Sequence, residues 1–344
     1  MIRILSILSL LFSVKILIIK ICSFILVIYL HMKSWQIALI TAFVLASLGV
    51  FNHQSSEMNE FETWKIEFGQ KFSPEEESFR KIIFNDNLIM IQKHNADSSK
   101  SYKMGVNQFT HLTAVEFQSH YLNSIYYKNN KDSSNKNEVF VEPLREIDWQ
   151  ALGKVTPVKD QGLCDAGYAF CSNGLMESYY LFNNKNVSLS EQQIIDCSAD
   201  YTTFGCQGGS RNGTLIYIRE KGLSTASEYP YKGVKGNCQK PSGDNKPAYT
   251  HAEFNGCNEM LTNLYNAPMT VAVNAKDFQT YKSGIFDGCT STEVNHDTYL
   301  IGANQGYWRI KNSWGLRWGE YGYMRLKSGN TCGICEKPGF SWKK

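Results

Sequence analysis

The hydrophobic pattern opens with two apolar runs that fill most of the first fifty residues. The run over 4–30 is interrupted only by Lys15 and Lys20, and a second run covers 36–49. Read from Met32, the chain has a short basic start, an apolar core and small residues at its end, which is the layout of a secretory signal peptide. We therefore predict an apolar leader over residues 1–49, with a signal peptide that starts at Met32.

Residues 1–31 have two explanations. The run is long enough to span a bilayer as a membrane anchor, or Met32 is the true start and the preceding residues are not translated. Lysine inside a membrane span is costly, so Lys15 and Lys20 favour the start at Met32. Both explanations direct the chain into the secretory pathway, to a lysosome, a vacuole or the cell exterior. Contact with a membrane is expected only through this leader, if it is retained.

A long helix is predicted over residues 73–95. Ser73 and Pro74, followed by acidic residues, form a typical helix start. Apolar residues then recur at helical spacing, and the predicted apolar stripe comprises Phe79, Ile83, Met90 and Ile91. Arg80, Asn87 and Asn95 are polar positions on the same helix.

The pattern after the leader divides the chain into two parts joined by a linker. Residues 57–127 are charged, helical in pattern and free of cysteine. Residues 128–138 are rich in Lys, Asn and Ser without apolar anchors, and we expect an exposed, protease-accessible linker over 128–143. Residues 144–344 hold most of the glycines and aromatic residues. This order is typical of a pro-segment followed by a mature domain.

Composition narrows the class of protein further. With 344 residues and 43% hydrophobic content, the chain is able to bury a sizeable core. Its net charge of +3 comes from scattered lysines, which gives no indication of nucleic-acid binding. Nine of the ten cysteines lie between Cys164 and Cys335, as expected for disulfides in an oxidising compartment. Asn186 and Asn212 begin N-glycosylation sequons, which are compatible with that route.

The segment before the linker resembles the pro-segment of papain-family, cathepsin L-like cysteine proteases. Its long helix matches the interrupted motif of that family at every position, namely Glu76, Arg80, Phe84, Asn87, Ile91 and Asn95. The following "GVNQFTH" matches the family's Gly-x-Asn-x-Phe-x-Asp motif, except that His111 replaces the usual acid. Because histidine titrates between pH 5 and 8, acid is expected to loosen this pro-segment if His111 titrates.

The rest of the chain resembles the mature domain of the same family. The motifs "VTPVKDQG", "LSEQQIIDCS", "GCQGG", "NH", "YWRIKNSWG", "WGEYGYMRL" and "CGIC" occur in the family's order and spacing. The resemblance implies an α+β, papain-like two-lobed fold with a helical half, a β-barrel-like half and a substrate cleft between them. A helical inhibitory pro-segment precedes it. No cofactor and no metal are implied.

The resemblance also assigns catalytic positions. Gln161 takes the place of the oxyanion glutamine, His296 that of the base, and Asn312 that of its orienting amide. Trp314 would shield the His–Asn bond from water. The family's nucleophile segment is Cys-Gly-Ser-Cys-Trp-Ala-Phe, whereas residues 164–170 are "CDAGYAF". The nucleophile position is therefore Gly167, which has no side chain.

Cys171 is the alternative nucleophile. It shares the helix face of Gly167 but lies about one turn (~6 Å) further along, whereas reacting atoms must approach to about 3–3.5 Å. We expect Cys171 to be a small buried hydrophobe. A sequence error at position 167 is a second route to an active enzyme, although Asp165, Ala166 and Tyr168 also depart from the family's pattern.

The cleft positions implied by the resemblance carry unusual charges. They are Asp165, Gly208, Gly209, Ser210, Arg211, Val294, Asp297 and Lys337. We expect Asp297 to pair with Lys337 or Arg211 and to close or repurpose the main specificity pocket, because an unpaired buried charge is costly. The alternative is that these side chains point to solvent. Gly208 and Gly209 leave one cleft wall open to extended peptides.

The resemblance further implies the disulfides Cys164–Cys206, Cys197–Cys238 and Cys289–Cys332. Cys171, Cys257 and Cys335 are left over, so at least one thiol is free or intermolecular.

Together these features predict a secreted or endolysosomal papain-like protein without proteolytic activity. Its expected partners are a peptide or protease-inhibitor-like ligand in the cleft and its own pro-segment. The alternatives are an active cysteine endopeptidase and a storage or structural protein. His296 and Asn312 are then either a relic dyad or, as we favour, a hydrogen-bonded pair that stabilises the domain.

Overall fold

The computed structural model describes residues 60–122 and 139–342. The leader predicted over 1–49 and most of the linker predicted over 128–143 lie outside these residues. Residues up to Lys71 form a unit separate from the remainder. In that unit, residues 60–68 are helical, and the rings of Phe61 and Trp64 stack at 5.7 Å. Within the described ranges, no helix is long and apolar enough to cross a membrane.

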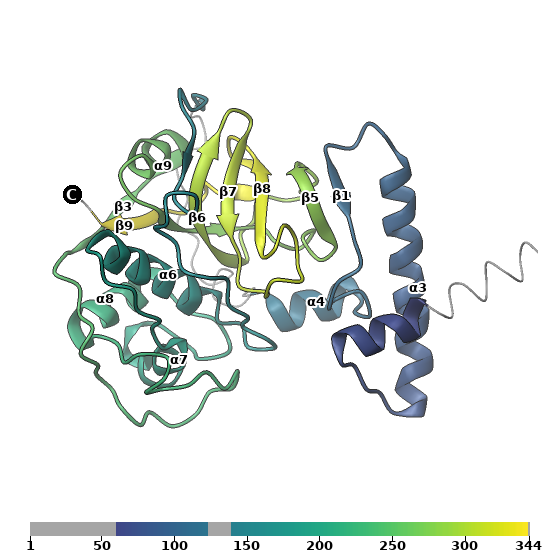
Figure 1. Cartoon of the computed structure of the whole chain (residues 1–344), viewed down its shortest axis with the longest axis horizontal. Helices are drawn as coiled ribbons and strands as arrows, with labels where there is room; N and C mark the ends of the chain where they lie inside the picture. Colours follow the sequence, from purple (N-terminus) through teal and green to yellow (C-terminus); the bar gives the residue numbers. More distant parts are fainter. Residues whose placement is uncertain (1–59, 123–138, 343–344) are drawn as a thin grey trace, which may run out of the picture. The chain divides into compact units, whose positions relative to one another are not determined.

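The second unit, which begins at Phe72, contains helices and one large sheet (Figure 1). The helices are α3 (Pro74–Ala96), α4 (Ala114–Tyr121), α6 (Gly167–Phe182), α7 (Glu191–Cys197), η1 (Ala199–Tyr201), α8 (Arg211–Lys221), α9 (Gly256–Leu264) and η2 (Thr331–Gly333). The strands are β1 (Tyr102–Met104), β2 (Ile147–Asp148), β3 (His251–Phe254), β4 (Met269–Val273), β5 (Tyr281–Phe286), β6 (His296–Asn304), β7 (Tyr307–Lys311), β8 (Tyr323–Lys327) and β9 (Gly339–Trp342).

Two apolar clusters confirm the predicted division into a helical half and a β half. One cluster gathers residues of α6, α7 and α8, and the other gathers residues of β4 to β8 together with part of the pro-segment. The sheet runs in the order β1-β5-β8-β7-β6-β4-β9-β3, with β2 paired to β6. The α+β, papain-like fold expected from the sequence is therefore confirmed.

Helix α3 starts where the sequence predicts it, but its buried face differs from the predicted stripe. The side chain of Ser73 accepts a hydrogen bond from the Glu76 amide at 3.3 Å, and Pro74 opens the helix. Phe79 and Met90 are 51% and 43% exposed, so their assignment to the buried stripe was wrong. The buried side chains are Ile83, Phe84, Leu88 and Ile91. Phe79 lies about 140° around the helix from Phe84, which turns it away from the packed face.

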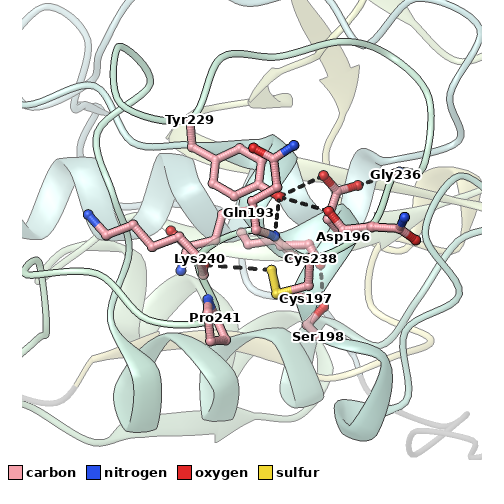
Figure 2. The surroundings of a disulfide bond; sticks show 12 residues. Gln193, Asp196, Cys197, Ser198, Tyr229, Gly236, Cys238, Lys240 and Pro241 are labelled. Carbon is pink, nitrogen blue, oxygen red and sulfur yellow. Dashed lines mark hydrogen bonds between the residues drawn. A yellow bond between two sulfur atoms is a disulfide. The ribbon is translucent and has the colours of Figure 1, made fainter.

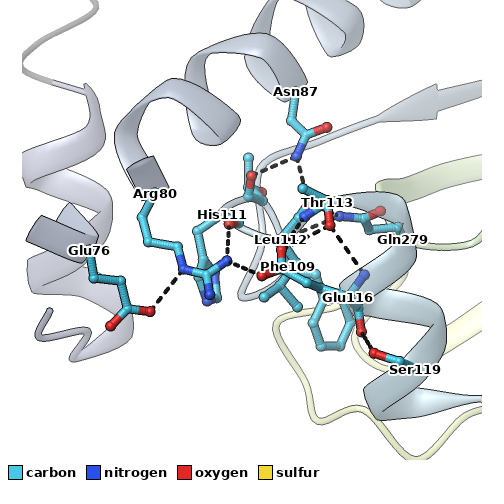
Figure 3. Close-up of polar contacts among 11 residues, drawn as sticks. Glu76, Arg80, Asn87, Phe109, His111, Leu112, Thr113, Glu116, Ser119 and Gln279 are labelled. Carbon is cyan, nitrogen blue, oxygen red and sulfur yellow. Dashed lines mark hydrogen bonds and ion pairs between the residues drawn. The ribbon is translucent and has the colours of Figure 1, made fainter. Parts of the chain in front are cut away.

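The polar motif positions of α3 hold the segment that follows it (Figure 3). Arg80 Nη1 donates to Glu116 Oε1 at 2.8 Å, and Asn87 Nδ2 donates to the carbonyls of Thr110 and Leu112 at 2.8 and 3.0 Å. Further along, Asn95 bonds both the amide and the carbonyl of Met104. The polar side chains of the motif therefore hold residues 102–116 in place through hydrogen bonds along α3.

The fixed segment adds a strand to the mature domain's sheet. Strand β1 pairs antiparallel with β5, with Tyr102 opposite Gly284 (Figure 1). Asn107 Nδ2 donates to the Gln279 carbonyl at 2.8 Å, and Gln279 Nε2 returns bonds to the Phe109 and Leu112 carbonyls at 3.0 and 2.8 Å. The pro-segment thus binds by extending a sheet edge, a common mode of peptide recognition.

Candidate active site

Strand pairing brings the two polar members of the candidate site together. Strand β6 begins at His296 and pairs antiparallel with β7, which ends at Lys311. Asn312 therefore follows β7 at the end of the sheet where β6 starts. Helix α6 packs across β6, and Gly174 permits the close approach, since a Cβ there would lie 3.1 Å from the Tyr299 ring. The N-terminus of α6 meets the start of β6.

The first residue of α6, Gly167, faces the imidazole of His296. A Cβ atom at position 167 would lie 3.1 Å from His296 Cε1 and 3.3 Å from Nδ1. It would also lie 2.8 Å from the backbone oxygen of Asp297, which is closer than real Cβ atoms come. The sequence-predicted juxtaposition of positions 167 and 296 is therefore present, in a tightly closed form.

His296 is fully buried and fixed on both sides. Its Nε2 lies 2.9 Å from Asn312 Oδ1, which also accepts the Ser313 amide at 2.8 Å. The indole of Trp314 stacks on the imidazole at 4.8 Å, as predicted for a shielding residue. Because an amide oxygen faces Nε2, the proton of the neutral ring lies on Nε2 and Nδ1 is the acceptor. No described residue hydrogen-bonds Nδ1.

The protonation state of this ring follows from its burial. Burial lowers the pKa of His296 to about 4, opposed by the hydrogen bond to Asn312. The imidazole is therefore neutral at physiological pH, and its acceptor nitrogen Nδ1 lies beside position 167.

Gln161 is buried beside this pair. Its Nε2 donates to the Cys164 carbonyl at 3.0 Å, and its Oε1 accepts from Ser313 Oγ at 2.6 Å. Ser313 thus fixes both the predicted oxyanion glutamine and the orienting Asn312. Sequence reasoning missed Ser313, although its place between Asn312 and Trp314 in "NSWG" was the available signal.

Cys171 lies inside the helix packing, as the sequence predicted. It is 3% exposed, and its Sγ lies 3.4 Å from the Tyr168 carbonyl as donor. Burial, followed by the negative charge of Asp297, raises the pKa of the Cys171 thiol well above its usual value. This is the reverse of the activation that a catalytic thiol requires.

The three disulfides implied by the resemblance are present. Cys164 pairs with Cys206, Cys197 with Cys238, and Cys289 with Cys332. Figure 2 shows the second of these, where Asp196 beside Cys197 accepts hydrogen bonds from the Tyr229 hydroxyl at 2.9 Å and the Gly236 amide at 2.6 Å.

A fourth disulfide resolves the three cysteines that the sequence left over. Cys257 pairs with Cys335, and Cys171 is the free cysteine of the described residues.

Two of the charged cleft positions, Arg211 and Asp297, are buried and paired. Arg211 Nε lies 2.8 Å from Asp297 Oδ1, with side-chain exposures of 4% and 1%. Arg211 Nη1 also donates to the Thr270 carbonyl at 3.0 Å. Arg211 is one of the two partners considered for Asp297, and Lys337, the other, is half-buried. The alternative in which Arg211 and Asp297 point to solvent is wrong.

The other cleft positions are also buried, each in its own local setting. Asp165 is 8% exposed, and burial together with the charge of Asp297 raises the pKa of its carboxyl well above the usual value. Ser210 caps α8 by accepting the Gly213 amide, and Val294 is buried. Gly208 has φ 91°, a conformation that favours glycine, and Gly209 bridges to Thr203.

A buried ionic network, missed from sequence, lies behind the site. Lys159 Nζ contacts Glu177 Oε1 at 2.7 Å and Glu191 Oε1 at 2.6 Å. Burial lowers the pKa of the nearby Lys311 to about 8.

A cavity of about 20 Å³ between these groups and Asn312 has room for about one water molecule. Among the described residues, no group of His, Cys, Asp and Glu is arranged to hold a metal.

The pro-segment covers the outer side of Trp314. The rings of Phe109 and Phe117 meet this indole edge-on at 5.5 and 5.3 Å, and Gln108 Nε2 donates to the Trp314 carbonyl at 2.6 Å. His111 lies two residues after Phe109, with its carbonyl 3.4 Å from Arg80 Nη1 (Figure 3). Burial, and then the positive charge of Arg80, lowers the pKa of His111 to about 4.

Comparison with known proteins agrees with this architecture. Residues 144–341 match the model of the papain family of cysteine proteases, and residues 61–117 match the cathepsin propeptide inhibitor domain. Cathepsin L 2 of Paramecium tetraurelia is 36% identical over 82% of this chain and 91% of its own length. The solved recombinant stem bromelain precursor covers 84% of this chain and 99% of its own at 34% identity, with a TM-score of 0.74. Digestive procathepsin L 3 of Tenebrio molitor larval midgut covers 84% and 99% at 29% identity, with a TM-score of 0.72. The chain therefore belongs to the papain family of cysteine proteases and carries an inhibitor-type pro-segment ahead of the protease domain.

Proposed function

We propose that this chain is a papain-like protein that binds peptides, protease inhibitors or a protein partner without cleaving them. The observation that carries the proposal is the glycine at the first position of α6, facing the acceptor nitrogen of His296 at the place where the family has its nucleophile. Glycine supplies no atom that attacks a carbonyl.

The chemistry of thiol proteases requires a sulfur within reach of the imidazole. A nucleophile and its base must approach to hydrogen-bond distance, and the thiolate is the reactive form. Cys171 is one helical turn away, donates to the Tyr168 carbonyl and has a raised thiol pKa. Neither Gly167 nor Cys171 therefore supports ordinary thiol-dependent hydrolysis.

The retained pair of His296 and Asn312 has a structural role in this proposal. The pair lies under Trp314, which packs on Phe109, Phe117 and Trp318. Losing either partner would leave a buried polar group without its hydrogen bond, which costs about 1–3 kcal/mol. Stability is a sufficient reason for the pair to persist without a thiol.

The cleft supports binding of an extended ligand without a large apolar anchor. The Arg211–Asp297 pair occupies positions that the resemblance assigns to the main specificity pocket, and its two side chains are almost fully buried. Gly208 and Gly209 leave the opposite wall without side chains. We therefore assign to the cleft a peptide or inhibitor segment held chiefly through its backbone.

Four disulfides and the predicted leader support a route through the secretory pathway to a lysosome, a vacuole or the cell exterior. An inactive domain cannot mature itself, so removal of the pro-segment requires a second protease.

Labelling with a peptidyl epoxide that alkylates papain-type thiols tests the proposal. A cleavage site is inserted at 128–138, and an unrelated, sequence-specific endoprotease then cuts there and frees the mature domain. No papain-type enzyme is added in this step. Intact mass is expected to show no adduct on the natural chain and one adduct on the Gly167→Cys variant. Circular dichroism verifies that the variant is folded.

An adduct on the natural chain that disappears in a Cys171→Ala variant would overturn the proposal, as would cleavage of peptide substrates at a rate that the epoxide abolishes. Saturable binding of cystatin-type inhibitors or of an unbiased peptide library to the mature domain is expected. Absence of any such binding would favour a storage or structural protein instead.

A further inference from the structure

We propose that Asn186 carries an N-linked oligosaccharide and that Asn212, the other sequon of the mature domain, stays unmodified in the folded protein. Both positions have the Asn-x-Ser/Thr pattern, Asn186-Val187-Ser188 and Asn212-Gly213-Thr214. Sequence alone does not separate them. Their surroundings in the structure differ in exposure, backbone conformation and hydrogen bonding.

The sequon at Asn186 is open to solvent. It lies in the connection between α6 and α7, where residues 185–188 form neither helix nor strand. Asn186 and Ser188 are both exposed. No hydrogen bond from a described residue holds the Asn186 side chain, whereas neighbouring Lys185 Nζ donates to Asn245 Oδ1 at 2.9 Å. A glycan at this position displaces no packed group.

The connection is nevertheless well anchored on both sides of the asparagine. Lys185 also lies over the Tyr180 ring at 4.6 Å, and the Ser188 carbonyl accepts the Ala226 amide at 2.9 Å. The loop therefore presents the amide of Asn186 outward from a fixed base. A glycan here would be carried at a defined place on the helical half of the domain.

The sequon at Asn212 is built into helix α8. Thr214 is fully buried, and its Oγ1 donates to the Ser210 carbonyl at 2.8 Å. Asn212 Oδ1 lies 2.7 Å from His251 Nε2. Around Gly213 the packing is so close that a Cβ atom would lie 1.8 Å from the Tyr201 carbonyl oxygen. Asn212 itself is half-buried, so an oligosaccharide on it would have to fit beside its contact with His251.

The transfer reaction is the ordinary one for this sequon class. The donor is an oligosaccharide linked to a lipid pyrophosphate. The bond between its anomeric carbon and the phosphate oxygen breaks, and a bond to Asn186 Nδ2 forms as that nitrogen loses one proton. The enzyme acts on chains whose folding is incomplete, so the claim for Asn212 concerns the folded product. In a chain modified at Asn212, the side-chain amide that contacts His251 carries the glycan.

Expression of the full chain in eukaryotic cells with a secretory route tests this inference. The secreted protein is analysed by intact mass before and after peptide-N-glycosidase treatment, and by peptide mapping of both sequons. The natural chain is expected to lose the mass of one glycan, located at Asn186. Asn186→Gln and Ser188→Ala are each expected to abolish the loss, and Asn212→Gln to leave it unchanged.

The Ser188→Ala variant keeps Asn186 in place, so it separates loss of the glycan from damage to the loop. Ser188→Thr retains the sequon and is expected to retain the glycan. A glycan mapped to Asn212 in the folded product, a secreted chain without any glycan, or a chain that remains outside the secretory route would each overturn the inference. None of these outcomes depends on whether the cleft binds or cleaves peptides.

Discussion

At the residue scale, Asp165 is the clearest departure from favourable burial near the site. Its carboxyl is almost fully buried, and burial and Asp297 raise its pKa. As the pH falls through about 3.9, the ordinary aspartate pKa, the carboxyl becomes protonated in the unfolded chain too, as it already is in the folded chain. As the pH rises, the unfolded chain loses this proton first, so the folded state is progressively disfavoured.

We therefore predict that Asp165→Asn stabilises the protein at pH 7 but not at pH 3.5. The expected rise in Tm at pH 7 is about 2–4 °C, the effect of about 1 kcal/mol on a domain of this size. Thermal unfolding followed by circular dichroism at both pH values measures it. The exposed Asp200 offers the control, since Asp200→Asn should change Tm at neither pH. An equal rise at both pH values would show that packing, not charge, limits Asp165.

At the element scale, the disulfide between Cys257 and Cys335 links α9 to the segment that follows η2 across 78 residues of sequence. Such a cross-link typically contributes about 2–4 kcal/mol. We predict that the Cys257→Ala/Cys335→Ala double variant loses this amount in urea unfolding under oxidising conditions. Cys171→Ala, which breaks no disulfide, should lose less. Equal losses in the two variants would mean that cavity formation, rather than the cross-link, accounts for the effect.

The helices, strands and disulfides also show which features of the fold the sequence was able to predict. Local signals located the start of α3, because Ser73 and Pro74 stabilise the first turn of the helix that begins at this point. Motif order located the family, three disulfides and the meeting of Gly167 with His296. The buried face of α3 was misassigned at Phe79, because the side chains that cover a helix come from distant parts of the chain. The Cys257–Cys335 bond and the β1–β5 register also depend on distant partners, so no local pattern specifies them.

At the scale of the whole molecule, we predict that pH acts on the pro-segment through His111. The ring is surrounded by Arg80, by Glu116 and Glu76, which pair with Arg80, and by the Phe72 ring. These groups belong to the pro-segment itself, so the pKa of about 4 is that of the folded segment, whereas a histidine in an unfolded chain titrates near 6.5. If the segment unfolds when it is released, His111 gains a proton below about pH 6.5 that it does not bind in the folded segment, so acid favours release with unfolding.

We predict that the affinity of the cleaved pro-segment falls as the pH drops from 7 to 4, by up to about tenfold for each pH unit below about 6.5. Dissociation after cleavage in the linker, followed by surface-based binding measurements, gives the affinity at each pH. His111→Gln should remove most of this dependence and leave the part due to the Arg80–Glu116 pair. A natural chain with the same affinity at pH 7 and pH 5 would contradict the role of His111.

The close approach of Asp297 to Gly167 has a consequence for the history of this chain. Glycine and cysteine codons differ by as little as one base, so regaining a thiol is a single mutational step. The carbonyl of Asp297, however, occupies the space that the new Cβ atom requires, and overpacking of this kind typically costs about 1–3 kcal/mol. A cysteine at position 167 is therefore expected to cost stability, unless β6 moves slightly away from the helix. Under the proposed function, regaining a nucleophile would therefore need two changes, a shift of β6 as well as a cysteine at position 167.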